Sequence, residues 1–212
     1  MDEQDIDIPC PICMVSGNVK MIAHVDEIPY FGEHTQVTVQ CHACGWRQTD
    51  FIPAEGKKPG GCSLFVNSAE LLNARVVRSS SCTVRIPELD LQVNPGGNST
   101  GYVSNIEGVL NRFIDVINLV KRGHETEIIR TEDDENRLEL MDEMSSLNVM
   151  LSRLESLKED DIDEPITMVL LDPHGHSMIL HPDTVDRELT DEEISELPVG
   201  PDPAVFSSEE LD

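Results

Sequence analysis

The sequence predicts a mainly β protein with a smaller helical part, in which a short N-terminal module precedes a larger domain. Two observations support this prediction. Four of the six cysteines lie in two Cys-x-x-Cys pairs within the first 44 residues. Beyond them, short apolar segments alternate with turn residues, and two longer segments repeat apolar residues with helical spacing. The chain has 212 residues, which is enough for one or two domains with a hydrophobic core.

The composition is strongly acidic, with 41 Asp and Glu residues against 15 Lys and Arg residues and a net charge of −26. Hydrophobic residues make up 39% of the chain and keep a regular periodicity, so we expect most of it to fold. We interpret the acidic composition as a halophilic adaptation, because high salt screens repulsion between surface carboxylates. The same charge argues against nucleic acid as the main partner, since binding a phosphate backbone needs a cationic surface.

The start of the chain and its apolar segments indicate where the protein works. Residues 1–9 are acidic, which excludes a secretory signal peptide with a basic start. No apolar run approaches the roughly 20 residues that cross a bilayer. We therefore expect a cytoplasmic protein without a membrane partner, in which cysteines stay reduced. We expect the two cysteines outside the pairs, Cys62 and Cys82, to be small buried residues.

The paired cysteines predict one structural zinc ion, bound by Cys10, Cys13, Cys41 and Cys44. A two-residue gap lets both thiolates of a pair reach the same ion, and 27 residues separate the pairs, as in a zinc ribbon. Four thiolates leave no open position for a substrate, so we expect no catalytic residue and no other cofactor here. Gly45 follows the second pair, where a positive φ angle would close the turn. A thioredoxin-like redox pair is the alternative, but two pairs favour metal.

The expected elements follow in order along the chain. The ribbon occupies residues 1–54, with strands at 19–28, 35–41 and 46–53 and a turn at 28–32. The glycine-containing loop 55–61 ends it. Further strands are expected at 62–66, 82–86, 166–171 and 177–180, with one helical turn at 68–72.

Two amphipathic segments predict an antiparallel helical hairpin over residues 106–158. The expected seams are Ile106, Val109, Phe113, Val116 and Val120 in the first helix and Leu140, Met144, Leu147, Leu151 and Leu154 in the second. We expect Gly123 to end the first helix and Thr131 with Asp134 to cap the second.

The C-terminal segment 182–212 is expected to be an acidic tail, with 11 acidic residues and one arginine after residue 182. Thr190 and Glu193 predict the cap of one short helix, and the rest is expected to be mobile.

Three histidines before this tail, His174, His176 and His181, could chelate iron in a β-barrel and make the protein an oxygenase. The surrounding Asp172-Pro173 turn and the missing carboxylate ligand favour exposed histidines instead.

The order of short motifs resembles the ZPR-type zinc-finger family of archaea and eukaryotes. The matching segments are Cys10-Pro-Ile-Cys13, Ile28-Pro-Tyr-Phe31, Cys41-x-x-Cys44-Gly45, Arg75-Val-Val-Arg-Ser79, Ile86-Pro-Glu-Leu89, Ile106-Glu-Gly-Val-Leu110 and Leu171-Asp-Pro-x-Gly-x-Ser177. The resemblance extends from residue 10 to residue 181, which is about four-fifths of the chain.

The resemblance implies a zinc ribbon followed by a double-stranded β-helix domain, at residues 62–181, that carries the helical hairpin. One cysteine set suggests the single-module archaeal form. Members of the family bind translation elongation factor 1-alpha and assist its folding, and they are not known as enzymes. The resemblance therefore implies a non-enzymatic, chaperone-like partner of this factor. A nucleic-acid-binding zinc-ribbon regulator and the metal-dependent oxygenase on the β-helix stay open as alternatives.

Overall fold

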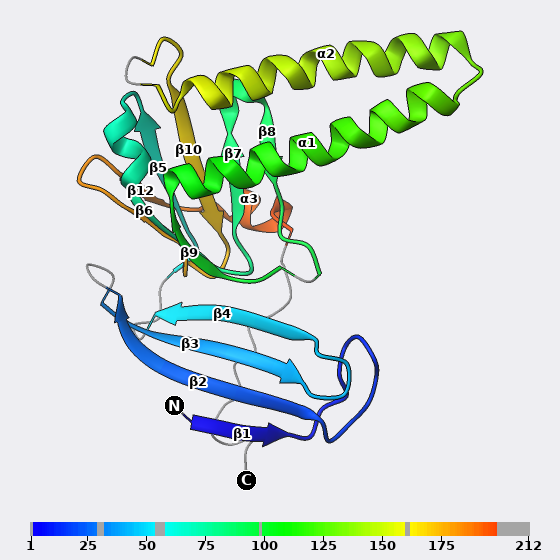
Figure 1. Ribbon diagram of the computed structural model, residues 1–212. Helices are drawn as coiled ribbons and strands as arrows, with labels where there is room; N and C mark the ends of the chain where they lie inside the picture. Colours follow the sequence, from blue (N-terminus) through cyan, green and yellow to red (C-terminus); the bar gives the residue numbers. More distant parts are fainter. Residues whose placement is uncertain (1, 29–31, 54–57, 98, 160–161, 199–212) are drawn as a thin grey trace. The chain divides into compact units, whose positions relative to one another are not determined.

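The computed structural model describes residues 2–28, 32–53, 58–97, 99–159 and 162–198 (Figure 1). The chain divides into two compact units. The first is formed by Met1–Leu64, Arg75–Val103 and Met168–Asp212, and the second by Phe65–Ala74 and Ser104–Thr167.

The N-terminal part of the first unit is an antiparallel sheet with the strand order β1-β2-β3-β4 (Figure 1). The bounds are Asp2–Ile6 for β1, Val19–Ile28 for β2, Gly32–Cys41 for β3 and Arg47–Pro53 for β4. The three strands expected in the ribbon are confirmed, although β3 begins earlier than predicted. Residues 29–31 of the expected turn lie outside the described residues.

The first strand, β1, was not expected, because its sequence is acidic and carries no apolar alternation. Tertiary pairing stabilises it instead. It pairs with β2 from Asp2↔Ala23 to Ile6↔Val19, and Ile6 is buried. Lys20 on β2 contacts Glu3 at 2.6 Å, which offsets the acidic charge of β1.

The core of this sheet is small. Val37 and Val39 alternate on one face of β3 and are 7% and 4% exposed. On the opposite face, the hydroxyls of Thr38 and Thr49 form a hydrogen bond of 3.0 Å. The buried cluster consists of Cys10, Val19, Val37, Val39 and Cys41. Such a cluster buries little apolar surface, so the sheet needs a further source of stability.

The remaining strands form two sheets, with the orders β12-β5-β10-β7-β8 and β11-β6-β9. This arrangement is the one expected of a double-stranded β-helix. The strand bounds are Gly60–Val66 for β5, Arg75–Arg78 for β6, Thr83–Ile86 for β7, Leu91–Val93 for β8, Tyr102–Asn105 for β9, Ile166–Asp172 for β10, Met178–Leu180 for β11 and Val185–Glu188 for β12. Two short 3-10 helices, Ala69–Asn73 and Pro87–Leu89, connect strands.

The second unit contains a helical hairpin formed by α1 (Ile106–Arg130) and α2 (Asp134–Ser156), which run side by side (Figure 1). The antiparallel hairpin is thus confirmed. Asn105 caps α1 by accepting the backbone N–H of Gly108 at 2.8 Å. The α1 residues that are buried are Ile106, Val109, Leu110, Phe113 and Ile117.

Three details of the hairpin differ from the prediction. Val116 and Val120 are 51% and 40% exposed, because Val116 lies at the edge of the buried stripe and Val120 lies beyond Ile117, the last buried residue of α1. Gly123 does not end α1, which continues to Arg130. Thr131 is the C-cap of α1, and Asp133 caps α2 by accepting the N–H of Glu135 at 3.0 Å.

Of the segment expected to be a mobile tail, the described residues 182–198 contain a strand and a helix. Strand β12 pairs with β5, from Val185↔Ser63 to Glu188↔Gly60. The predicted cap of a short helix is confirmed, because Thr190 and Glu193 form a capping box at the start of α3 (Asp191–Glu196).

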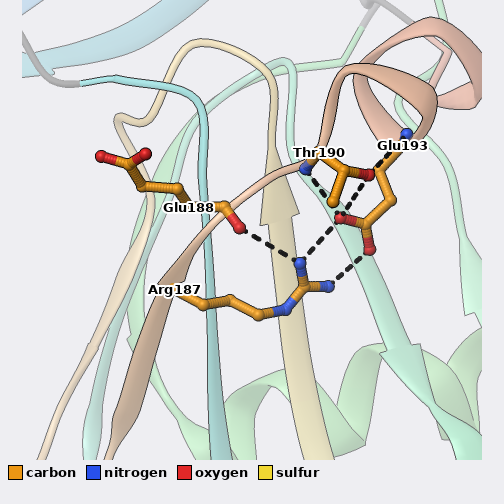
Figure 2. A network of polar contacts seen from close by, with 4 residues as sticks. All are labelled: Arg187, Glu188, Thr190 and Glu193. Atoms are coloured by element: carbon orange, nitrogen blue, oxygen red, sulfur yellow. Dashed lines mark hydrogen bonds and ion pairs between the residues drawn. The ribbon is translucent and has the colours of Figure 1, made fainter.

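An ion pair also stabilises this segment, as Figure 2 shows. The two guanidinium nitrogens of Arg187 donate to the Glu193 carboxylate at 2.8 and 2.6 Å (Figure 2). The bond from Arg187, followed by the backbone N–H of Thr190, lowers the pKa of Glu193 to about 2. Leu189 and Leu197 pack with Leu171 in a buried cluster, which explains why this acidic segment is held against β10.

Candidate metal centre

Two turns of the same geometry present the paired cysteines. In the first turn, the N–H of Met14 donates to the carbonyl of Cys10 at 2.9 Å. In the second, the N–H of Gly45 donates to Cys41 at the same distance. Gly45 has a φ of 77°, so the expected positive φ is confirmed. Its counterpart Met14 has a φ of 60°, and a side chain there costs about 1 kcal/mol of backbone strain.

The four thiols converge on one point. The Sγ atoms of Cys10, Cys13, Cys41 and Cys44 all lie within 4.8 Å of one another. Cys10 and Cys44 are 3.7 Å apart, as are Cys13 and Cys41. A tetrahedron with zinc–sulfur bonds of about 2.3 Å has edges of about 3.8 Å, so the spacing fits one Zn²⁺ ion. Cys10 and Cys41 are fully buried, whereas Cys44 lies at the surface.

The backbone and the neighbouring thiols affect how easily each thiol of the cluster ionises. Burial opposes ionisation of Cys10, but the backbone N–H groups of Cys13 and Ile12 outweigh it and lower the pKa of its thiol to about 7. The N–H of Trp46 favours the thiolate of Cys44, but burial and hydrogen bonds to the other cysteines raise its pKa to about 12. The thiols therefore cannot all ionise at neutral pH on their own, and a dication would stabilise four thiolates together.

The three histidines weighed as an alternative metal site, His174, His176 and His181, do not come close enough to share an ion, and they are half-buried rather than exposed as expected. The rings of His174 and His176 lie side by side with centroids 5.9 Å apart. His181 instead accepts the N–H of Asp183 at its Nδ1 atom, at 3.2 Å. Within the described part of the chain, the four cysteines are the only group of three or more His, Cys, Asp or Glu side chains close enough to share a metal ion.

A buried carboxylate on β10, Asp172, organises the larger domain of the first unit. Its Oδ1 atom accepts the Ser81 hydroxyl at 2.6 Å and the N–H of His174 at 3.0 Å. Its Oδ2 atom accepts the hydroxyls of Ser79 and Ser177, at 2.7 and 2.6 Å, and the N–H of His176 at 3.0 Å. Burial raises the pKa of Asp172, but these hydrogen bonds outweigh it and hold the pKa below its usual value.

Sequence reasoning missed this network. The run Ser79–Ser81 reads as an ordinary turn, yet its residues are at most 1% exposed. The available signal was the pair of family motifs that contain Ser79 and Asp172, which lie 93 residues apart and meet through their side chains. Pattern within one segment cannot reveal such a contact.

A second buried carboxylate, Asp50 on β4, contacts the same serine run. It accepts the backbone N–H of Ser80 at 3.0 Å and also its hydroxyl. Nearby, the buried Arg78 donates to the carbonyl of Cys82 at 2.8 Å and lies 5.6 Å from the ring centre of Tyr102. The segment 78–82 is therefore a polar junction within the first unit.

No helix among the described residues is both long and apolar enough to cross a membrane.

Comparison with known proteins identifies the family. A family model described as the ZPR1 jelly-roll domain matches residues 70–197, which confirms the expected β-helix architecture. A ZPR1-like protein of Methanocaldococcus jannaschii is 36% identical, over 91% of this chain and 89% of its own. A ZPR1-like protein of Pyrococcus horikoshii is 37% identical, over 91% of this chain and 80% of its own. The zinc finger chaperone zpr1 of Schizosaccharomyces pombe is 28% identical over 83% of this chain, which spans 35% of that protein. Because these matches extend over most of the sequence and the cysteine cluster precedes the jelly roll, the chain belongs to the ZPR1 family, in a single-module form.

Proposed function

We propose that this chain is a zinc-stabilised interaction protein that binds translation elongation factor 1-alpha and assists its folding in the cytoplasm. The observation that carries the proposal is the closed cluster of Cys10, Cys13, Cys41 and Cys44, which we assign as the ligands of one structural zinc ion. A metal with four protein ligands stabilises a binding module and offers no position for a reacting substrate. The S. pombe relative, a zinc finger chaperone by name, supports the same class of function.

The proposed partner surface includes the hairpin. On α2, Leu138 and Met141 are 64% and 54% exposed, and on α1 Leu119 is 62% exposed. A cavity of about 630 Å³ lies elsewhere in the jelly roll, but a smaller one of 340 Å³ is lined by Met141, Met144 and other residues of the hairpin itself. Methionine adapts to irregular apolar surfaces, which suits a client that is not fully folded.

The ribbon would supply a second contact. Ile12 and Met14, in the first cysteine turn, are 54% and 70% exposed. A metal ion would fix the backbone of the turn that carries them, so little backbone ordering is needed on binding. A net charge of −26 opposes the alternative of nucleic-acid binding, because a phosphate backbone would be repelled.

A binding experiment with purified components tests the proposal. The full chain, immobilised in its zinc-loaded form, should capture purified elongation factor 1-alpha and raise the yield of active factor on refolding. The same chain stripped with a chelator should capture less, because the ribbon contact is lost. Equal capture of an unrelated GTP-binding protein, or no gain in refolding, would contradict the proposal.

A further inference from the structure

Asp50 links the cysteine-containing sheet to the jelly roll within the first unit. It lies on β4, six residues after Cys44, and is 4% exposed. Its carboxylate accepts both the N–H and the hydroxyl of Ser80, which is fully buried. The backbone of β4 is held at the same place, because the N–H of Gly101 donates to the carbonyl of Thr49 at 2.8 Å.

The approach at this junction is close enough to require glycine. A Cβ atom at Gly101 would lie 2.8 Å from the Asp50 carboxylate and 3.2 Å from the carbonyl of Arg78. Real Cβ atoms essentially never come within 3.0 Å of another atom, so a side chain at residue 101 would displace the Asp50 carboxylate. The Asp50 carboxylate is therefore tightly packed against the backbone of Gly101.

From Ser80 the hydrogen bonds continue to a loop. The flanking residues Ser79 and Ser81 both donate to Asp172. Asp172 in turn accepts the backbone N–H groups of His174 and His176. A buried, connected path thus leads from β4 to the loop of residues 173–177.

We propose that metal binding at the four cysteines controls the conformation of the 173–177 loop, and that Asp50 couples the two. This rests on the zinc site of the proposed function. A small metal-bound module loses its structure when the ion leaves, so it provides the two-state element that coupling requires. Strand β4 follows the second cysteine turn directly, where the N–H of Cys41 donates to the carbonyl of Trp46 at 2.8 Å.

The physical cause of the coupling is the burial of Ser80. When β4 loosens, the Asp50 carboxylate withdraws and leaves the N–H and hydroxyl of Ser80 without an acceptor. A buried polar group in that state must find another partner, so the serine run shifts and its bonds to Asp172 weaken. The backbone N–H groups of His174 and His176 then lose their fixed acceptor.

The loop of residues 173–177 borders a surface cavity, whose shape would change with the loop. Gly175 and Ser177, from the controlled loop, line a cavity of 540 Å³ together with Cys62, Lys58 and Arg187. A shift of the loop would therefore change the shape of this surface in response to the metal state of the ribbon.

Amide hydrogen exchange in the full chain, followed by NMR, tests the coupling at three reporter N–H groups: those of Ser80, His174 and His176. Removing zinc with a chelator should speed their exchange at least tenfold. The N–H of Gly108, which Asn105 caps in the second unit, serves as the internal reference and should not change.

Substitution of Asp50 distinguishes coupling through this residue from a general loss of structure after zinc removal. Zinc-loaded Asp50→Ala should keep one zinc ion and show fast exchange at the three reporters, and chelation should add less than a twofold change. Glu33→Gln, which alters an exposed carboxylate on neighbouring β3, should behave like the parent. If Asp50→Ala does not fold, Ser80→Ala replaces it. This variant removes the hydroxyl bond and keeps the backbone N–H bond to Asp50, so chelation should speed exchange at His174 and His176 less than in the parent.

Two results would overturn the proposal. One is exchange that speeds up after chelation only within residues 2–53 while the three reporters stay protected. The other is a response to chelation as large as the parent's in Asp50→Ala, or in Ser80→Ala where that variant replaces it. Loss of zinc from the parent without any loss of the cysteine turns would contradict the proposed function instead, and zinc analysis of each sample distinguishes the cases.

Discussion

The hydroxyl of Ser81 donates a hydrogen bond of 2.6 Å to Asp172, although 91 residues separate them in the sequence. Both residues are at most 1% exposed, so the bond lies in the interior. Ser79 and Ser177 donate to the same carboxylate. A buried charge is tolerated only where such donors replace water, and Asp172 is therefore a structural centre of the jelly roll.

Replacing this carboxylate should destabilise the fold without altering its shape. In Asp172→Asn, one acceptor oxygen becomes an NH₂ group that faces donors, so buried hydroxyls and N–H groups lose their partner. We expect a loss of about 3 kcal/mol in the free energy of unfolding, read from the urea midpoint. The control is Asp163→Asn, an exposed acid that should leave the midpoint unchanged. Equal midpoints for the two variants would mean that the serine network contributes little.

The same residue predicts a dependence of stability on pH. Hydrogen bonds from the serines and from His174 hold the pKa of Asp172 below its usual value in the folded state, against the effect of burial. The unfolded state therefore binds a proton more readily as pH falls. The stabilisation is complete above the unfolded pKa of about 4 and is lost as pH falls through the lower folded pKa. Unfolding measured from pH 6 to pH 2 should show a steeper loss in the parent than in Asp172→Asn, and parallel curves would refute this assignment.

Metal content gives an independent test of the cysteine cluster. Elemental analysis should find one zinc ion per chain, and Cys10→Ser or Cys41→Ser should remove it together with the structure of the N-terminal sheet, whose core is small. Cys62→Ser changes a cysteine outside the cluster and should keep the ion. His174→Ala should keep it as well. A stoichiometry near two that falls to one in His174→Ala would revive a histidine metal site.

The parts predicted correctly from sequence are those with a local chemical cause. The Cys-x-x-Cys turns, the positive φ of Gly45 and the Thr190–Glu193 cap each depend on residues within a few positions of one another. Apolar spacing likewise predicted both long helices. The family resemblance added the β-helix, which periodicity alone could not distinguish from another β architecture.

The parts that were missed depend on contacts between distant segments. Strand β1 is acidic and exists because β2 and Lys20 offer it a partner. Strand β12 carries only exposed residues but pairs with β5, and the neighbouring Leu189 is buried. The role of Asp50 depends on Ser80, 30 positions away, and that of Asp172 depends largely on Ser81, 91 positions away. No window of sequence contains these partners together.

Salt should stabilise the protein if the acidic composition is a halophilic adaptation. At a net charge of −26, repulsion among carboxylates opposes the compact state, and the screening length falls from about 10 Å at 0.1 M salt to about 3 Å at 1 M. We expect the melting temperature to rise with KCl, by roughly 2–4 °C for each kcal/mol gained. The slope should be smaller near pH 4, where carboxylates begin to protonate. A flat or falling curve at neutral pH would require another explanation of the composition.

The hairpin surface gives the last prediction, which concerns the proposed partner. Core packing and client binding could both account for the methionines and leucines of α2. The exposed fraction of each side chain distinguishes the two explanations. Met150 is half-buried, whereas Leu138 and Met141 are more than half exposed and can be changed with little cost to folding. Replacing each of these two by Glu should leave the melting temperature within a few degrees of the parent.

Binding should respond much more strongly, because a charge placed in an apolar contact is desolvated without a partner. For Leu138→Glu and Met141→Glu we expect at least a tenfold rise in the Kd for elongation factor 1-alpha, measured by titration calorimetry at fixed salt. Ser152→Glu, which adds the same charge at an exposed polar residue of α2, is the matched control and should bind like the parent. If all three variants bind equally well, the hairpin is not the surface that binds the elongation factor. Weakened capture by the first two alone, with folding intact, would support its role.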